Sequence, residues 1–163
     1  MTNDQLTADE QRVLDLVNDA KIAMLTYVDP SGKLLSKPMA TQDTDVDGSL
    51  YFIAELHSDK VQALQADPRV NVSYSERGSW VSIAGTASVV DDEARLEELW
   101  SAFTDSWLQG GPDNPENILI EVDAESAEYW DAPGGSKVVQ LTNLVKAKVT
   151  GDRVRGDNET VEM

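Results

Sequence analysis

Hydrophobic residues near the start of the chain recur at helical spacing. The run Thr7-Ala8-Asp9-Glu10 fits a capping box, in which the threonine and glutamate side chains satisfy free backbone amides at a helix start. Val13, Leu14, Val17 and Ala20 then fall on one side of the expected helix. We therefore expect a helix from about residue 8 whose apolar side closes one end of a sheet.

A β-hairpin is predicted directly after this helix. Residues 22–28 are a β-type run, and Asp29-Pro30-Ser31-Gly32 has the composition of a tight turn. Residues 33–41 would form the return strand, although Pro38 has no amide hydrogen to donate to a sheet ladder. The return strand should therefore lie at a sheet edge or bulge at Pro38, which would leave backbone groups open to a ligand.

The middle of the chain predicts a further strand, a short helix and a second hairpin. The strand covers residues 50–54, and the helix follows with Ser58 as its N-cap and ends before Pro68. Residues 70–74 and 80–90 both alternate polar and apolar positions, and a glycine-serine turn separates them. This spacing is typical of two antiparallel strands.

The remaining segments predict one more helix and at least one more strand. Asp91 or Asp92 can cap an amphipathic helix that ends before residue 110. Residues 118–122 are the last clear strand, and residues 124–130 follow it.

About six strands, mostly joined by hairpins, with three inserted helices and no regular βαβ alternation, indicate an α+β fold built on a small antiparallel barrel. The length of 163 residues suits one domain, which we place at residues 1–150, followed by a frayed acidic C-terminal tail at residues 151–163. No stretch approaches the roughly 20 apolar residues that cross a bilayer, and the first residues lack the features of a signal peptide. We therefore expect a cytoplasmic protein without a membrane partner.

The charge balance argues against several classes of partner. Thirteen Lys and Arg against 30 Asp and Glu give a formal net charge of −17. Such a surface repels nucleic-acid phosphates and anionic membranes, so we expect neither as a partner. Scattered acids of this kind are typical of solubility or salt tolerance. In so acidic a chain, a lysine near a strand end, such as Lys37 or Lys60, can mark a local pocket for an anionic ligand.

Residue types argue against several kinds of catalytic and metal site. The chain has no cysteine and one histidine, His57, which excludes thiolate zinc sites, cysteine nucleophiles and histidine-rich metal sites. It has no GxGxxG motif, Walker loop or GxSxG elbow. Asp43-x-Asp45-x-Asp47-Gly48 opens like a calcium loop, but Ala54 stands where its last carboxylate ligand should be. We interpret it as an acidic hairpin turn, predict no metal, and name no catalytic acid, base or nucleophile.

Ser58-Asp59-Lys60 is the strongest candidate for an anion site. A serine N-cap, the free amides of a first helical turn and a lysine two residues later can converge on one phosphate. By itself such a short pattern is more often a simple N-cap beside a surface lysine. Its interpretation therefore depends on the neighbouring segments.

Eight segments follow one another in a recognisable order: Lys37-Pro38-Met39-Ala40, Tyr51-Phe52-Ile53-Ala54, Ser58-x-Lys60, Trp80-Val81-Ser82-Ile83-x-Gly85-x-Ala87, Val89-Val90-Asp91-Asp92, Leu99-Trp100, Trp107-x-x-Gly110-Gly111 and Ala127-Glu128-Tyr129-Trp130. Together they resemble the flavin-binding split barrels. The chain looks most like the general-stress-protein branch of the pyridoxamine 5'-phosphate oxidase-like family, over about residues 7–140. The resemblance implies a small antiparallel six-stranded split β-barrel with inserted helices.

The same resemblance implies a homodimer that holds FMN in two clefts between its subunits. Ser58 and Lys60 would bind the phosphate, the backbone of residues 37–39 and 52–54 would line the ribityl chain and the isoalloxazine ring, and two tryptophans would approach from the partner subunit. A charged clamp beside an apolar, aromatic-rimmed slot suits a flavin. The alternative for each tryptophan is ordinary core or dimer packing. The implied cofactor-binding residues are Lys37, Pro38, Met39, Phe52, Ile53, Ala54, Ser58, Lys60, Trp107 and Trp130.

Two positions depart from the family pattern. Lys37 stands where relatives often carry arginine, and Ala54 where a hydroxyl residue is common. Both changes remove hydrogen-bond donors, so FAD or a deazaflavin are alternatives to FMN, and the cofactor could bind weakly. The expected function is a stress-related, flavin-dependent oxidoreductase acting on a small molecule. The alternatives are a non-enzymatic protein that binds or sequesters flavin, and an acidic adaptor without a ligand.

Overall fold

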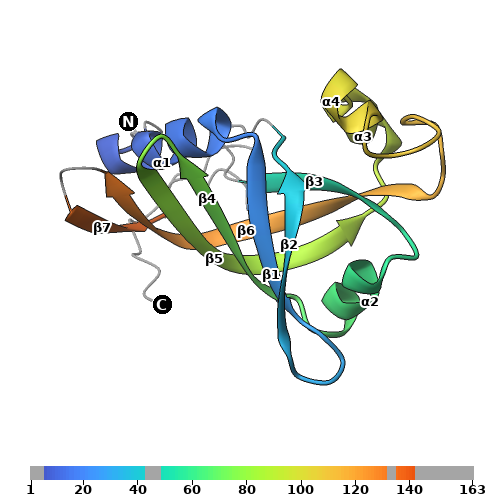
Figure 1. Cartoon of the computed structure of the whole chain (residues 1–163), viewed down its shortest axis with the longest axis horizontal. Helices are drawn as coiled ribbons and strands as arrows, with labels where there is room; N and C mark the ends of the chain where they lie inside the picture. Colours follow the sequence, from blue (N-terminus) through green and yellow to red (C-terminus); the bar gives the residue numbers. More distant parts are fainter. Residues whose placement is uncertain (1–5, 43–48, 132–134, 142–163) are drawn as a thin grey trace, which may run out of the picture.

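Seven antiparallel strands form one sheet in the residues that this computed structural model describes, which are 6–42, 49–131 and 135–141 (Figure 1). The sheet order is β2-β1-β4-β5-β6-β3, and β7 pairs with β6. In chain order the elements are α1 (Ala8–Asp19), β1 (Ile22–Val28), β2 (Leu34–Ala40), β3 (Ser49–Glu55), α2 (Asp59–Ala66), β4 (Arg69–Glu76), β5 (Ser79–Val90), α3 (Glu93–Leu99), α4 (Ala102–Asp105), β6 (Asn117–Asp131) and β7 (Gly135–Gln140). The order from β2 to β3 therefore contains the six strands that the sequence predicted. The seventh strand, β7, was not predicted.

The sheet curls into a barrel that stays open between its two end strands. Among the described strands, β2 pairs with β1 alone and β3 with β6 alone, yet β2 and β3 contact each other. This arrangement is the expected α+β split barrel, and it leaves one hydrogen-bonding edge free on each end strand. Of the two arrangements expected from Pro38, an edge strand or a bulge, the structure has the first: β2 is an edge strand and keeps a regular register with β1.

Apolar and polar residues alternate along the strands, so the apolar side chains of each strand point into the barrel and fill it. Inward residues such as Leu25, Phe52 and Ile83 are almost fully buried. α1 packs its apolar side against this core and lies across the ends of several strands (Figure 1). Its capping box is confirmed: the Glu10 amide donates to Thr7 Oγ1 at 3.1 Å, and the Thr7 amide donates to the Glu10 carboxylate at 2.8 Å.

A bulge between Ala84 and Gly85 shifts the register of β5 on β6. A Cβ atom at Gly85 would overlap the carbonyl oxygen of Asp123, so glycine alone fits this close approach. Bulges bend a strand and increase its twist, which helps two long strands to follow a curved core.

The helix expected after Asp92 is shorter than predicted. α3 ends at Leu99, and Trp100 adopts an extended conformation. The Ser101 hydroxyl accepts a hydrogen bond from the Thr104 amide at 3.2 Å, which starts the separate four-residue α4. The second cap interrupts the apolar stripe that had suggested one continuous helix.

Residues 124–130 continue the preceding strand, so β6 runs for 15 residues. The calcium-like segment Asp43–Gly48 and the tail 151–163 lie outside the described residues. None of the helices in the described ranges combines the length and apolar character needed to cross a bilayer.

Candidate functional site

We call the opening of the barrel between the unpaired strands β2 and β3 the gap, and Lys37 and Met39 lie on β2 beside it. In the β1–β2 register, Lys37 is opposite Leu25 and Met39 is opposite Ala23, and both β1 residues are fully buried. Directly opposed residues share a sheet face, so Lys37 and Met39 belong to the inner face of β2. Pro38 lies between them on the outer face.

On β3, residues 52–54 are buried on both faces of the sheet. Phe52 and Ala54 belong to the barrel core and are 0% and 1% exposed. Ile53 belongs to a second apolar cluster with Leu96 and Leu119, on the side covered by α3. Because these side chains are enclosed, a ligand in the gap would meet the free backbone edge of β3.

α2 begins shortly after β3, with Ser58 at the predicted N-cap position. The expected capping hydrogen bond is not formed, and Ser58 Oγ is buried without a hydrogen-bond partner in the described part of the chain. A buried polar group without a partner costs about 1–3 kcal/mol. The first amides of a helix also lack intrahelical acceptors. The start of α2 therefore favours a ligand that accepts hydrogen bonds.

Lys60 carries a half-buried ammonium group with a weak partner. Its Nζ donates to Met39 Sδ at 3.4 Å, and a thioether sulfur is a poor acceptor. None of the ion pairs among the described residues includes Lys37 or Lys60. Burial lowers the pKa of Lys60, Glu55 opposes this effect, and Lys37 lowers the pKa further.

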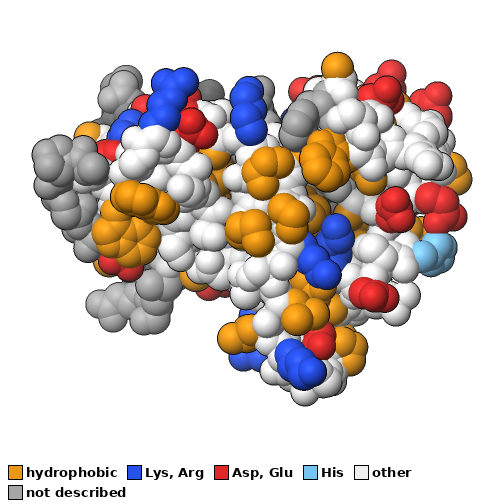
Figure 2. All heavy atoms as spheres, viewed as in Figure 1, with side chains coloured by type: hydrophobic (Ala, Val, Ile, Leu, Met, Phe, Trp, Pro, Cys, Tyr) orange, Lys and Arg blue, Asp and Glu red, His pale blue; other side chains and the backbone are white. Residues whose placement is uncertain are grey.

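Two lysines close enough to influence each other would be stabilised by a bound anion, because charge-assisted hydrogen bonds to phosphate or carboxylate are strong. Figure 2 shows basic side chains gathered beside hydrophobic ones over the region where β2 approaches α2. The structure thus brings Lys37, Met39 and Lys60 together, although they come from two elements.

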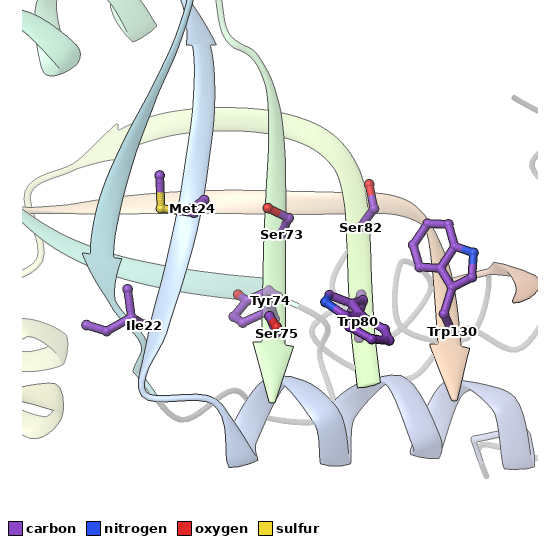
Figure 3. Close-up of a pocket in the computed structure, with 9 residues that line it drawn as sticks. Ile22, Met24, Ser73, Tyr74, Ser75, Trp80, Ser82 and Trp130 are labelled. Atoms are coloured by element: carbon purple, nitrogen blue, oxygen red, sulfur yellow. The ribbon is translucent and has the colours of Figure 1, made fainter. Parts of the chain in front are cut away.

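The two tryptophans of the predicted cofactor set are exposed and come from separate elements. Trp107 follows α4 and is 66% exposed, and Trp130 lies on β6 and is 36% exposed. Trp130 is directly opposite Trp80 on β5. Both indoles line a hollow of about 380 Å³ together with Ile22 and Met24 of β1 (Figure 3). Trp80 was not predicted as a site residue, because its pairing with Trp130 depends on the β5–β6 register.

These groups fit a ligand with a phosphate at one end. The Ser58 hydroxyl, the first amides of α2 and the Lys60 ammonium can all donate to phosphate oxygens, and the free edges of β2 and β3 offer backbone groups to the rest of the ligand. No group of three or more acidic or histidine side chains in the described ranges could hold a metal ion. The arrangement is therefore a candidate anion and cofactor site.

The sequence is similar to several known proteins. A family model described as "Pyridoxamine 5'-phosphate oxidase like" matches residues 8–155. Protein bli-3 of Neurospora crassa is 31% identical over 135 residues, which are 74% of this chain and 65% of that protein. The chain thus spans slightly less than two thirds of the length of this curated relative.

Solved structures share the fold. A Clostridium acetobutylicum protein related to general stress protein 26 of Bacillus subtilis, of the pyridoxinephosphate oxidase family, gives a TM-score of 0.71 at 18% identity over 83% of this chain and 96% of that one. General stress protein 26 from Bacillus anthracis gives 0.70 at 19% identity over 82% and 99%. These likenesses show the fold alone. The family model matches most of the sequence, and the chain belongs to the pyridoxamine 5'-phosphate oxidase-like family.

Proposed function

We propose that the gap between β2 and β3 binds FMN and that the protein uses it as an oxidoreductase acting on a small molecule. One observation carries this proposal. Among the residues that the structure describes, Ser58 Oγ is buried without a hydrogen-bond partner at the start of α2, two residues before a half-buried ammonium whose hydrogen-bond partner is the sulfur of Met39. Both groups lack the strong acceptor that a phosphate would provide.

In this proposal the chain supplies binding and orientation. Ser58 and Lys60 bind the phosphate, and Lys37 adds a second positive charge. The free edges of residues 37–39 and 52–54 line the ribityl chain and the ring through their backbone groups. The flavin supplies the hydride or electron transfer, so the chain needs no acid or base of its own for that step.

We further propose that the site is completed by a second copy of the chain. Lys37 and Met39 belong to the inner face of the sheet, whereas Trp130 lies in a hollow on the outer side of β1, β4, β5 and β6. An indole on the outer face would reach a flavin in the gap as a contribution from another protomer. The proposed assembly is therefore a homodimer with the flavin between subunits, in which Trp107 and Trp130 come from the partner.

Titration of the purified protein with FMN, riboflavin and FAD, followed by flavin fluorescence, tests the binding site. We expect FMN to bind about 10-fold or more tightly than riboflavin, because a charged hydrogen bond contributes about 1.5–3 kcal/mol. Equal affinities for the two would contradict the phosphate site. If none of the three flavins binds, the proposal as a whole is wrong. If FAD binds more tightly than FMN, the proposed cofactor is FAD and not FMN.

A turnover experiment distinguishes a flavin-dependent enzyme from a protein that only binds or stores flavin. The FMN-loaded protein is mixed with NADH or NADPH and an electron acceptor, and the flavin absorbance is followed. Repeated reduction and reoxidation supports the oxidoreductase, whereas a single reduction or none supports a protein that stores flavin. The stress-related role stays a prediction from the family resemblance.

A further inference from the structure

The Tyr27 hydroxyl is a buried polar group that has no part in the cofactor site proposed above. Tyr27 lies on β1 and is 2% exposed. Among the described residues, its hydroxyl oxygen has no hydrogen-bond partner. A buried tyrosine hydroxyl usually has one, because an unsatisfied polar group destabilises the fold. What this hydroxyl can bind depends on where it lies in the barrel.

Tyr27 shares the inner face of the sheet with Lys37. In the β1–β2 register, Tyr27 is opposite Leu35, and Leu25, two residues earlier, is opposite Lys37. Residues two positions apart on a strand point to the same face, and Leu25 is fully buried in the core. The phenol therefore enters the barrel beside the strand that borders the gap.

α2 covers the end of the barrel at which Tyr27 lies (Figure 1). The helix contacts β1, and its residues Val61 and Leu64 belong to the same apolar cluster as Tyr27. β4 begins at Arg69, shortly after the helix, and its residue Val70 is opposite Tyr27. The short connection and the strand register thus hold the phenol and α2 at the same end of the sheet.

The electrostatic environment of Tyr27 includes the first residue of α2. Burial raises the pKa of Tyr27 above its usual value of 10.0, and the charges of Asp59 and Asp29 raise it further. Asp59 is the first residue of the helix and directly follows Ser58. The hydroxyls of Tyr27 and Ser58 therefore lie near the same helix start. The raised pKa keeps the phenol protonated, so it can donate a hydrogen bond.

Phosphate is the ligand chemistry that suits this group of donors. Tyr27 and Ser58 each carry a hydroxyl without an acceptor in the described part of the chain, and the Lys60 ammonium donates to the weakly accepting sulfur of Met39. A phosphate monoester carries three strongly accepting terminal oxygens. These oxygens match the two hydroxyls and the ammonium in number.

We propose that Tyr27 is a further phosphate-binding residue, whose hydroxyl donates to a terminal oxygen of the ligand's phosphate group together with Ser58 and Lys60. This inference rests on the proposed function and deepens it, because it adds a donor from β1 to a site built from β2, β3 and α2. Tyr27 precedes Ser58 by 31 positions, so no local sequence pattern connects the two hydroxyls.

Tyr27→Phe tests the proposal, because it removes the hydroxyl and keeps the ring that packs in the core. FMN and riboflavin differ only in the phosphate, and fluorescence titrations with both compare the variant with the wild type. We expect Tyr27→Phe to weaken FMN binding by about 2- to 10-fold, the value of one ordinary hydrogen bond, and to leave riboflavin binding unchanged. The melting temperature of the flavin-free variant should equal the wild-type value or exceed it, because an unsatisfied buried hydroxyl is removed.

Tyr129→Phe is the matched control. It makes the same change in another buried tyrosine, whose hydroxyl donates to Asp9 of α1 at 2.7 Å. We expect Tyr129→Phe to lower the melting temperature and to leave the ratio of FMN affinity to riboflavin affinity unchanged. A similar fall of that ratio in both variants would show that loosened packing is the cause, and would overturn the proposal. Equal FMN affinities in the wild type and Tyr27→Phe, or equal losses for FMN and riboflavin, would overturn it as well.

Thermal melts in inorganic phosphate separate this inference from the proposed cofactor. Sodium chloride keeps the ionic strength constant, so that general screening of the acidic chain does not differ between samples. If the wild type binds no flavin but phosphate raises its melting temperature more than that of Tyr27→Phe, the cofactor is refuted and the phosphate site with Tyr27 stands. If the wild type binds no flavin and phosphate stabilises both proteins equally, or neither, the role of Tyr27 is refuted too.

Discussion

Lys60 Nζ lies 3.4 Å from Met39 Sδ, and this contact joins the first turn of α2 to the inner face of β2. The two residues are 21 positions apart in the sequence. The sulfur is a weak acceptor, so a phosphate oxygen could take its place with a gain in hydrogen-bond energy. The contact therefore holds the ammonium group at the gap in the absence of ligand.

Replacing Lys60 with methionine should weaken FMN binding and leave riboflavin binding nearly unchanged. The substitution removes the charge and keeps a side chain of similar length against Met39. Loss of a charge-assisted hydrogen bond corresponds to about 1.5–3 kcal/mol, or about 10- to 150-fold in the dissociation constant. Fluorescence titration with both ligands measures the effect. Lys33→Met, at an exposed position in the β1–β2 turn, is the control, and equal losses for FMN and riboflavin would indicate local misfolding instead.

Ser58→Ala should weaken FMN binding without destabilising the fold. The Ser58 hydroxyl forms no capping bond and is buried without a partner among the described residues, so its removal should leave the free energy of unfolding unchanged or raise it, by up to the roughly 1–3 kcal/mol that an unsatisfied buried polar group costs. Its loss should weaken FMN binding by about 2- to 10-fold, which corresponds to one neutral hydrogen bond. Thr7→Ala is the contrasting variant, because it breaks a formed capping box and should cost about 0.5–2 kcal/mol. Urea unfolding and FMN titration compare the two, and a large stability loss in Ser58→Ala would contradict the absence of a cap.

FMN affinity should fall with rising pH at the alkaline end of the stable range. Burial, with Lys37 nearby, lowers the pKa of Lys60, so its ammonium loses its proton at a lower pH than an ordinary lysine does. Bound phosphate favours the charged form, so binding in that range takes up a proton and weakens as pH rises through the lowered pKa. Lys60→Arg keeps its charge and should remove most of this decline. Titrations from neutral to alkaline pH measure the profile, and a wild-type curve parallel to that of Lys60→Arg would contradict the role of Lys60.

Asp131→Asn should lower the melting temperature at neutral pH and have little effect in strong acid. Both oxygens of Asp131 accept from Arg12 at 2.7 Å, and the Ser79 hydroxyl donates to it at 2.7 Å. The Arg12 hydrogen bonds, followed by the Ser79 bond, lower the pKa of Asp131 from 3.8 to about 2. A carboxyl whose pKa is lower in the folded state stabilises the fold above its unfolded pKa and loses that effect as pH falls toward about 2.

Thermal melts of the wild type and Asp131→Asn at several pH values test this dependence. The difference in melting temperature should narrow as pH falls from 3.8 toward about 2. A difference that stays constant across this range would show that the substitution acts through packing and not through the charge.

Short-range patterns predicted those parts of the fold that depend on neighbouring residues. The Thr7 capping box, the edge position of the strand that contains Pro38, and the hairpin between β4 and β5 were all predicted and are confirmed. The break between α3 and α4 was missed, because a second cap at Ser101 competes with a continuous apolar stripe. β7 was not predicted, because no local sequence pattern indicates that this segment pairs with β6.

The candidate site also combines features that the sequence predicted with features that only the fold shows. Ser58 and Lys60 are two positions apart, so a serine N-cap followed by a lysine was visible as an anion signal in the sequence. The formation of a gap between β2 and β3, the placement of Lys37 and Met39 on its inner side, and the pairing of Trp80 with Trp130 depend on strand order and register. Local hydrogen bonds and side-chain periodicity involve residues a few positions apart, so they can be predicted from the sequence. The pairing of distant strands depends on how the whole chain buries its apolar surface, so only the tertiary structure shows it.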